Sequence, residues 1–308
     1  MAKILITGGS GRLGRSVVAG FAEAGHQIVS LDRQPPPDPV DGVAYESVDL
    51  LDAGATRSLF ARVAPEAVVS LAAIAVPFSA PEDVILKTNA AIAHNVTEAA
   101  VGSGARKVVV ASSPSIMGYG SPAGWVPPRL PLDEDVTPRP WHAYGLSKYV
   151  AEQVAAMFAA KHGPGDGEHG VKFASFRPCY VIAPEEWEGA PTQQGHTVAE
   201  RLDDPALSAP ALFNYVDARD VTDFLLRLLE KMHLIDNGDV FFVGAADAMA
   251  REPLAEVIPE IYPELAHLAA GLTGSAPAFS IEKARRVIGW EPKRSWRTEL
   301  TDRVGAAG

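Results

Sequence analysis

The chain has 308 residues, of which 47% are hydrophobic and 21% are charged, so it can bury a full core. This length suits one large α/β unit with a smaller lobe. The formal net charge of −11 argues against nucleic acid as a partner, because phosphate binding needs clustered Lys and Arg.

The cysteine content and the apolar runs bear on the compartment. The single cysteine, Cys179, excludes an internal disulfide and is typical of a reducing compartment. No apolar run approaches the roughly 20 residues of a membrane span. The first residues, MAKILITGG, lack the basic-then-apolar layout of a signal peptide. We therefore expect a cytoplasmic protein with no membrane partner.

The first part of the chain alternates short β-rich runs with helical patterns, which is typical of a parallel sheet. The predicted elements are strand 3–7, helix 13–24, strand 27–31, strand 43–48, helix 53–63, strand 67–71, helix 84–103 and strand 107–111. Gly25 ends the first helix, and the proline cluster at 35–37 forms a loop. The apolar run 107–111 suits a central strand that is covered on both faces.

Residues 112–140 are irregular, with three glycines and seven prolines. A loop of that length inside a compact domain is usually functional. A helix over 143–161 follows, then the flexible stretch GPGDGEHG and a strand over 171–177.

The remainder of the chain is less regular. Residues 185–211 are polar and contain prolines, 216–231 are predicted to be helical, and 239–243 form a strand that returns to the sheet. The tail holds one or two helices and a polar end. We therefore predict a Rossmann-type doubly wound parallel sheet with a smaller substrate lobe. The sheet domain comprises 1–177 and 212–244, and the lobe comprises 178–211 and 245–308.

A glycine-rich turn links the first strand to the first helix. From Gly9 it matches G-x-G-x-x-G, with Gly11 and Gly14 as the later glycines. Such glycines permit a tight turn, close approach of a pyrophosphate and helix–strand packing. The free N–H groups and the dipole at the helix start then favour phosphate. The turn predicts a dinucleotide site.

The acidic residue Asp32 follows the second strand, where a carboxylate accepts hydrogen bonds from the adenosine ribose and repels a 2′-phosphate. This position favours NAD. Arg33 and Arg12 could each meet a 2′-phosphate, so NADP stays an alternative.

Tyr144 and Lys148 stand four residues apart on a predicted helix, so they share one face. An ammonium group near a phenol lowers the phenol pKa, which is normally about 10. The pair can then move a hydroxyl proton while hydride passes to or from nicotinamide. We predict an oxidoreductase.

These motifs resemble the extended short-chain dehydrogenase/reductase family, which includes NAD-dependent sugar epimerases and dehydratases. Gly8, Gly11 and Gly14 match its G-x-x-G-x-x-G, and YGLSK matches its Y-x-x-x-K. The segments VDLLD, LAAI, KTNAA, FRPCYVIAP and IGWEPKRS also match. The resemblance implies a cofactor site that contains Gly8, Gly11, Arg12, Leu13, Gly14, Asp32, Arg33, Asp49, Leu50, Leu71, Ala72, Ala73, Asn89, Tyr144, Lys148 and Pro178.

In that family a Ser or Thr beyond the fifth strand completes the active site. Counting back from Gly118 aligns Ser113 with it, which implies that Ser113, Tyr144 and Lys148 are the catalytic residues. The Ser113 hydroxyl would stabilise charge on the substrate oxygen. The substrate contacts expected from the same alignment are Ala75, Ser112, Ser113, Ser115 and Tyr180.

Departures from the family's patterns narrow the reaction. The related 4,6-dehydratases carry Asp-Glu after the active-site Thr, whereas Pro114 and Ser115 stand here. The nucleotide-sugar enzymes carry an Arg before the Val-Asp pair, and residues 209–215 contain none. Tyr180 and Ala183 replace the usual Asn and Gly. The AAIAVPF and HAYGLSK stretches resemble the uronate and aldose dehydrogenases more closely.

Three interpretations follow. We favour an NAD-dependent oxidoreductase that acts on a sugar or related small molecule. A sugar epimerase is the first alternative, and a non-catalytic NAD(P) sensor is the second. Such sensors often lose the Tyr or the Lys, and this chain keeps both. The family also implies a homodimer, and the eight histidines show no metal-ligand spacing.

Two features leave both a structural and a functional interpretation open. His142 either starts the helix or contacts the substrate. Trp125, Trp141 and Trp187 lie in expected substrate-facing loops, where they either pack or form a pocket wall. Cys179 is expected to be a buried core thiol.

Overall fold

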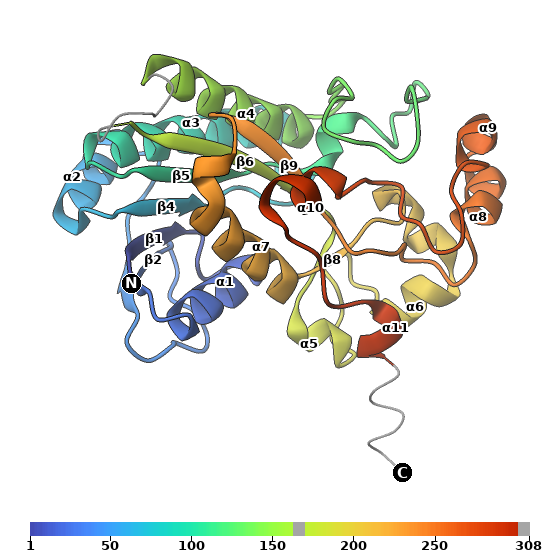
Figure 1. The fold of residues 1–308 in the computed structure, drawn as a ribbon, viewed down its shortest axis with the longest axis horizontal. Coiled ribbons are helices and arrows are strands. Elements are labelled where there is room, and N and C mark those ends of the chain that lie inside the picture. Colours follow the sequence, from blue (N-terminus) through green and yellow to red (C-terminus); the bar gives the residue numbers. More distant parts are fainter. Residues whose placement is uncertain (163–169, 301–308) are drawn as a thin grey trace, which may run out of the picture.

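A parallel sheet forms the centre of the described part of the chain (Figure 1). The computed structural model describes residues 1–162 and 170–300. In spatial order the sheet strands are β3 (Ala44–Glu46), β2 (Gln27–Leu31), β1 (Lys3–Thr7), β4 (Ala67–Ser70), β5 (Lys107–Ala111), β6 (Lys172–Pro178) and β9 (Asp239–Val243). The strand order reverses between β1 and β4, which is where ligands bind in doubly wound sheets. The predicted fold class is confirmed.

Helices cover both faces of the sheet, as the apolar strands require. One layer comprises α2 (Ala53–Val63), α3 (Glu82–Gly102) and α4 (Ala143–Lys161). Phe60, Val96 and Phe158 of this layer lie in one hydrophobic core. The other face carries α1 (Arg12–Glu23) and α7 (Ala218–Lys231), whose Phe21 and Phe224 lie in a second core.

A buried ion pair fastens α4 to the sheet. The Arg177 guanidinium on β6 donates to both carboxylate oxygens of Glu152 on α4, at 2.8 and 3.0 Å. Both side chains are almost fully buried, and the guanidinium lies over the Phe242 ring. The pair fixes the helix that carries Tyr144 and Lys148.

A smaller lobe lies at the carboxyl ends of the strands (Figure 1). Its elements are β7 (Val181–Ile182), α5 (Pro184–Trp187), α6 (Val198–Asp203), β8 (Val216–Asp217), α8 (Leu254–Ile261), α9 (Ala266–Ala269) and α11 (Trp296–Glu299). Trp187, Leu202, Tyr215 and Met249 form one core of this lobe. The buried residues of α8 and α9, such as Ile258 and Ala269, belong to the core that includes α1 and α7. No helix in residues 1–162 and 170–300 has the length and apolar character needed to cross a membrane.

The loop over 112–140 begins with a short 3-10 helix, Pro114–Met117. Gly118 ends that helix with φ 92°, and a Cβ there would lie 2.3 Å from the Arg139 main-chain oxygen. A glycine is therefore required at this position.

Most predicted elements occur, with ends that move by one or two residues. Strand 43–48 is shorter, because only Ala44–Glu46 pairs with β2. Helix 216–231 begins two residues late, because Val216 and Asp217 pair with β7 as strand β8.

The later segments contain more structure than we predicted. Residues 185–211 contain α6 and most of α5, and the tail contains more than two helices. Among these, α10 (Glu282–Ile288) packs on β9 and α7, so this part of the predicted lobe lies on the sheet. The predicted break GPGDGEHG falls outside the described residues except for Gly170.

Candidate active site

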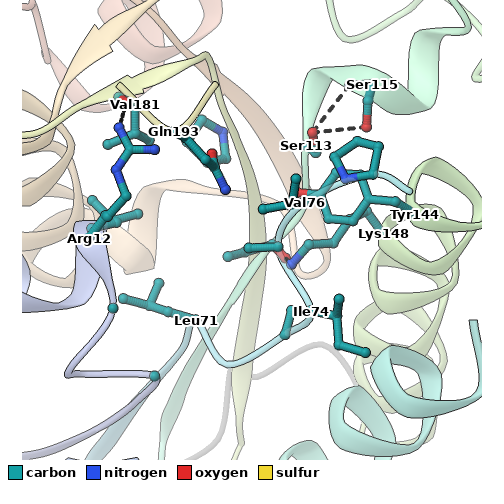
Figure 2. Close-up of a pocket in the computed structure, with 18 of the residues that line it drawn as sticks. Arg12, Leu71, Ile74, Val76, Ser113, Ser115, Tyr144, Lys148, Val181 and Gln193 are labelled. Carbon is teal, nitrogen blue, oxygen red and sulfur yellow. Dashed lines mark hydrogen bonds between the residues drawn. The ribbon is translucent and has the colours of Figure 1, made fainter. Parts of the chain in front are cut away.

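One cavity of about 1360 Å³ lies at the carboxyl ends of the strands, between the sheet and the lobe. It runs from the glycine turn and Asp32 at one end to Tyr144 on α4 at the other. Figure 2 shows Arg12 and Val181 on one side, Tyr144 and Lys148 on the opposite side, and Gln193 between them.

The glycine turn is as tight as the motif predicts. A Cβ on Gly14 would lie 2.0 Å from the Gly8 main-chain oxygen, and a Cβ on Gly8 would lie 2.8 Å from the Ala72 nitrogen. Gly11 precedes the first turn of α1 and lines the cavity. The close packing therefore requires glycine at positions 8 and 14, and the turn lies at a helix N-terminus, where phosphate is favoured.

Asp32 directly follows β2 and lines the cavity. Its carboxylate accepts hydrogen bonds from the main-chain nitrogens of Arg33, at 2.7 Å, and Ser10, at 3.1 Å. Arg12 was predicted as a possible 2′-phosphate partner, but its guanidinium donates to the Val181 oxygen at 2.9 Å and pairs with Glu186. Of the two candidate arginines, Arg33 is the one beside Asp32.

The predicted cofactor residues come together, with one exception. All of them line the cavity except Asn89, and so do the predicted substrate contacts. Asn89 is buried on α3, where its side chain bonds the main chain of Ile74 at 2.7 and 3.1 Å and the Ser147 hydroxyl at 3.0 Å. It therefore positions the segment after β4 against α4.

Tyr144 and Lys148 are both buried on the first turns of α4. The Lys148 ammonium lies 6.0 Å from the centroid of the Tyr144 ring and donates to the Ala111 oxygen at 2.9 Å. His142 caps the helix, because its Nδ1 accepts from the Gly145 nitrogen at 3.1 Å.

The ionisation of this pair differs from our expectation. Lys148 was predicted to lower the pKa of Tyr144, yet burial raises the pKa of Tyr144 to about 12, opposed by a hydrogen bond with Ser113. Burial also lowers the pKa of Lys148 to about 8. Removal from water penalises both charged forms, so at pH 7 the phenol holds its proton and the ammonium stays charged.

The three serines after β5 have different partners. The Ser113 oxygen accepts from the Ser115 nitrogen at 3.2 Å and from the Ser115 hydroxyl at 3.0 Å (Figure 2). Ser113 therefore caps the 3-10 helix while it contacts Tyr144. The Ser112 hydroxyl donates to the Lys148 main-chain oxygen at 3.3 Å, so it holds α4.

Beyond Tyr144 the wall comes from several distant segments, and we name this part the substrate end. It comprises Ala75, Val76, Pro77, Phe78, Tyr119, Gly120, Ser121, Trp141, His142, Tyr180, Gln193, Gln194, Asn214 and Tyr262. Apart from Ala75 and Tyr180, the sequence did not commit to these residues as contacts. The two long loops over 112–140 and 185–211 supply five of these residues, namely Tyr119, Gly120, Ser121, Gln193 and Gln194.

Some of the tryptophan and cysteine candidates line the cavity, and others are buried in the core. Trp141 lines the cavity, whereas Trp187 is buried and donates to Asp217 at 2.6 Å. Trp125 packs against Tyr119, behind the wall. Cys179 is 3% exposed, as expected for a core thiol, and also borders the cavity.

Comparison with known proteins agrees with this geometry. The profile of the NAD dependent epimerase/dehydratase family matches residues 4–244, so the chain belongs to this family. The family is that of NAD-dependent enzymes built on the extended short-chain dehydrogenase fold, and the predicted enzyme class and cofactor are confirmed.

Individual relatives have differing activities. The chain is 26% identical to a UDP-glucose 4-epimerase of Streptomyces lividans over 95% of this chain and 92% of that protein. It is 34% identical to a uronate dehydrogenase of Agrobacterium fabrum over 53% of this chain and 58% of the relative. A short-chain dehydrogenase/reductase superfamily protein from Agrobacterium tumefaciens, solved with bound NAD, has TM-score 0.70 and 21% identity. That match covers 99% of this chain and 97% of the solved one.

Proposed function

We propose that this enzyme transfers hydride between NAD and the hydroxyl- or carbonyl-bearing carbon of a sugar or related small molecule. Tyr144, Lys148 and Ser113 are the proposed catalytic residues. The observation that carries the proposal is that Tyr144, Lys148 and Ser113 line the same cavity as the glycine turn. A hydride donor or acceptor held on that turn would reach across the cavity toward these residues.

The cofactor site fits a dinucleotide. The glycine turn would hold the pyrophosphate, Asp32 the adenosine ribose, and Lys148 the nicotinamide ribose. NAD, when bound, supplies or accepts the hydride. NADP stays an alternative, because Arg33 is exposed beside Asp32.

The chain's own residues would manage the proton. In carbonyl reduction Tyr144 Oη passes its proton to the substrate oxygen as the carbon gains hydride; alcohol oxidation reverses both transfers and starts from the Tyr144 phenolate. Ser113 orients the substrate oxygen through its hydroxyl. The Lys148 charge would stabilise the Tyr144 phenolate, which forms when Tyr144 donates its proton in reduction and which accepts the proton in oxidation.

A sugar epimerase is the second candidate. The epimerase match spans 95% of this chain, whereas the uronate dehydrogenase match spans 53%. Against a nucleotide-sugar substrate, residues 209–215 carry no Arg. Arg219, which follows the Val216-Asp217 pair closely, pairs with Asp217 and Glu299 and does not line the cavity.

The test is absorbance at the reduced-nicotinamide band, with NAD and a panel of sugars, uronic acids and alcohols. Net NADH formation that disappears in Tyr144→Phe supports the dehydrogenase. Sugar interconversion without net NADH, also lost in Tyr144→Phe, supports the epimerase. NAD binding with neither activity supports the sensor.

We further propose a cytoplasmic homodimer that pairs through α3 and α4. The exposed apolar side chains Leu146 and Met157 on α4 support such a face. Light scattering of the purified chain tests it, and a monomer at micromolar concentration contradicts it. The division into a sheet domain and a substrate lobe is proposed on the same family grounds.

A further inference from the structure

Charge is distributed unevenly along the cavity. The charged side chains among its lining residues are those of Arg12, Asp32, Arg33, Asp49 and Lys148. All of these belong to the predicted cofactor site. The substrate end adds only His142 as a titratable base, and burial lowers its pKa, so that it is neutral at pH 7.

The polar groups of the substrate end are amides and hydroxyls. Gln193 and Gln194 come from the lobe, and Ser121 comes from the loop after β5. The His142 ring carries its proton on Nε2, because Nδ1 accepts from the Gly145 nitrogen. Such groups hydrogen-bond substrate hydroxyls but do not neutralise a carboxylate or a phosphate.

One guanidinium lies behind this wall without lining it. Arg201 is 1% exposed, and its Nη1 donates to Gln194 Oε1 at 2.6 Å. Its guanidinium also lies 4.4 Å from the centroid of the Tyr180 ring. Because Arg201 is buried and does not line the cavity, an anionic substrate group would reach it only if the wall rearranged.

Aromatic rings gather at the other side of the substrate end. The centroid of the Phe78 ring lies 5.7 Å from that of Trp141 and 5.3 Å from that of His142. The His142 ring is nearly parallel to the Tyr144 ring, with centroids 6.2 Å apart. The Trp141 indole nitrogen donates a hydrogen bond of 3.0 Å to the main-chain oxygen of Tyr119, which fixes the Trp141 ring. The rings of Phe78, Trp141 and His142 therefore form a row of aromatic contacts between the exposed Phe78 ring and Tyr144, the proposed proton donor.

Phe78 is an unfavourable residue for the fold alone. Its φ is 61°, a left-handed conformation that bulky residues rarely adopt, and its side chain is 61% exposed. An exposed ring on a strained backbone adds little stability, and such strain often marks ligand sites. A ligand that covers the ring would account for the residue.

We infer that the substrate is an uncharged, hydroxylated molecule that carries an aryl group, and that this group packs on Phe78 and Trp141. The inference rests on the proposed function and narrows its substrate class. It separates this chain from relatives named for uronate and UDP-glucose, both of which are anionic.

The test uses the NAD-loaded protein and two glucosides that differ only in the aglycone. Titration calorimetry compares phenyl β-D-glucoside with methyl β-D-glucoside, and glucuronate and glucose 6-phosphate serve as the anionic probes. We expect the phenyl compound to bind about 3- to 10-fold more tightly than the methyl compound, the range expected for an aromatic contact. It should also bind more tightly than both anions.

Two single substitutions test whether Phe78 and Trp141 cause the preference for the phenyl compound. Phe78→Gly and Trp141→Ala should each abolish most of the phenyl preference and leave NAD affinity unchanged. Phe78→Gly should also leave the melting temperature unchanged or higher, because glycine relieves the positive φ. Val126→Ala is the control, since Val126 is 51% exposed in the loop that precedes Trp141 and does not line the cavity.

Absent or equal binding of the phenyl compound overturns the inference, and so does tighter binding of either anion. Failure of the proposed function looks different. In that case the phenyl preference persists in binding, but no alcohol in the panel gives NADH that depends on Tyr144.

Discussion

The Lys148 ammonium group donates a 2.9 Å hydrogen bond to the main-chain oxygen of Ala111, the last residue of β5. Lys148 is 6% exposed, so a cation is held in mostly apolar surroundings. Burial lowers its pKa from 10.5 to about 8. The buried Lys148 charge next to Tyr144 therefore lowers the stability of the fold.

Lys148→Met should therefore stabilise the protein while abolishing hydride transfer. The fall in pKa corresponds to about 3 kcal/mol, and the lost hydrogen bond offsets about 1 kcal/mol. We expect a gain of about 2 kcal/mol in the free energy of unfolding at pH 7, measured by denaturant titration of the NAD-free protein. A less stable variant would contradict the assigned burial cost.

The same substitution has a defined pH dependence. The folded-state pKa of Lys148 lies below its unfolded value, so the unfolded chain binds the extra proton between pH 8 and 10.5. Wild-type stability therefore gains from this group as pH rises through that window. The advantage of Lys148→Met should be constant below pH 8 and should shrink toward pH 10.5. A constant difference up to pH 10.5 would mean that Lys148 is not the titrating group.

Ser113 and Ser115 should differ in their effect on rate. Ser113→Ala removes the hydroxyl that contacts Tyr144, and we expect kcat to fall about 100-fold, as for loss of one oxyanion donor. Ser115→Ala should lower kcat only a few-fold, because the Ser115 nitrogen still donates to Ser113. Steady-state kinetics measure both, with melting temperature as the folding control. Equal losses would indicate that Ser115 itself contacts the substrate.

Asp32 should set the cofactor preference. Asp32→Ala removes the carboxylate that would accept from the ribose and leaves Arg33 beside the site, so the NAD/NADP ratio of kcat/KM should fall at least ~10-fold. Asp38→Ala is the control, because Asp38 is exposed in the following loop and does not line the cavity. An unchanged ratio in Asp32→Ala would place the ribose elsewhere.

The buried pair between Arg177 and Glu152 should be costly to break from one side. Arg177→Met leaves a buried carboxylate unpaired and should lower the free energy of unfolding by about 3–5 kcal/mol. The double variant with Glu152→Leu should recover most of that loss. A double variant as unstable as the single one would show that packing on Phe242, and not the charge, dominates.

Much of the fold was predictable because the first half repeats one local pattern. The strand at Lys3–Thr7 and the strand at Lys107–Ala111 are apolar runs bounded by turns, and both were predicted to the residue. The two-residue strand at Val216–Asp217 was not predictable, since only its pairing with Val181–Ile182 distinguishes it from the helix that follows. In the tail, Pro259 interrupts the helical pattern of the sequence, although α8 itself spans Leu254–Ile261.

The site residues also differ in whether local sequence spacing could predict them. Tyr144 and Lys148 could be predicted as neighbours because a spacing of four residues on a helix places them on one face, and both line the cavity. Phe78, Trp141 and Tyr262 meet only through the tertiary fold, and no local spacing relates them. The direction of the Tyr144 pKa was predicted wrongly for a related reason, because the sequence shows a neighbouring charge but not the depth of burial.

His142 limits how this enzyme can change its specificity. Its ring borders the cavity while its Nδ1 caps α4, so a replacement must still accept a hydrogen bond from the Gly145 nitrogen. Only Asn, Asp, Ser and Thr commonly do so, and all are smaller. Phe78 and Trp141, whose rings contact the His142 ring, do not cap α4. In directed evolution, we expect new substrates to be reached through residues 78 and 141, with position 142 left nearly invariant among active clones.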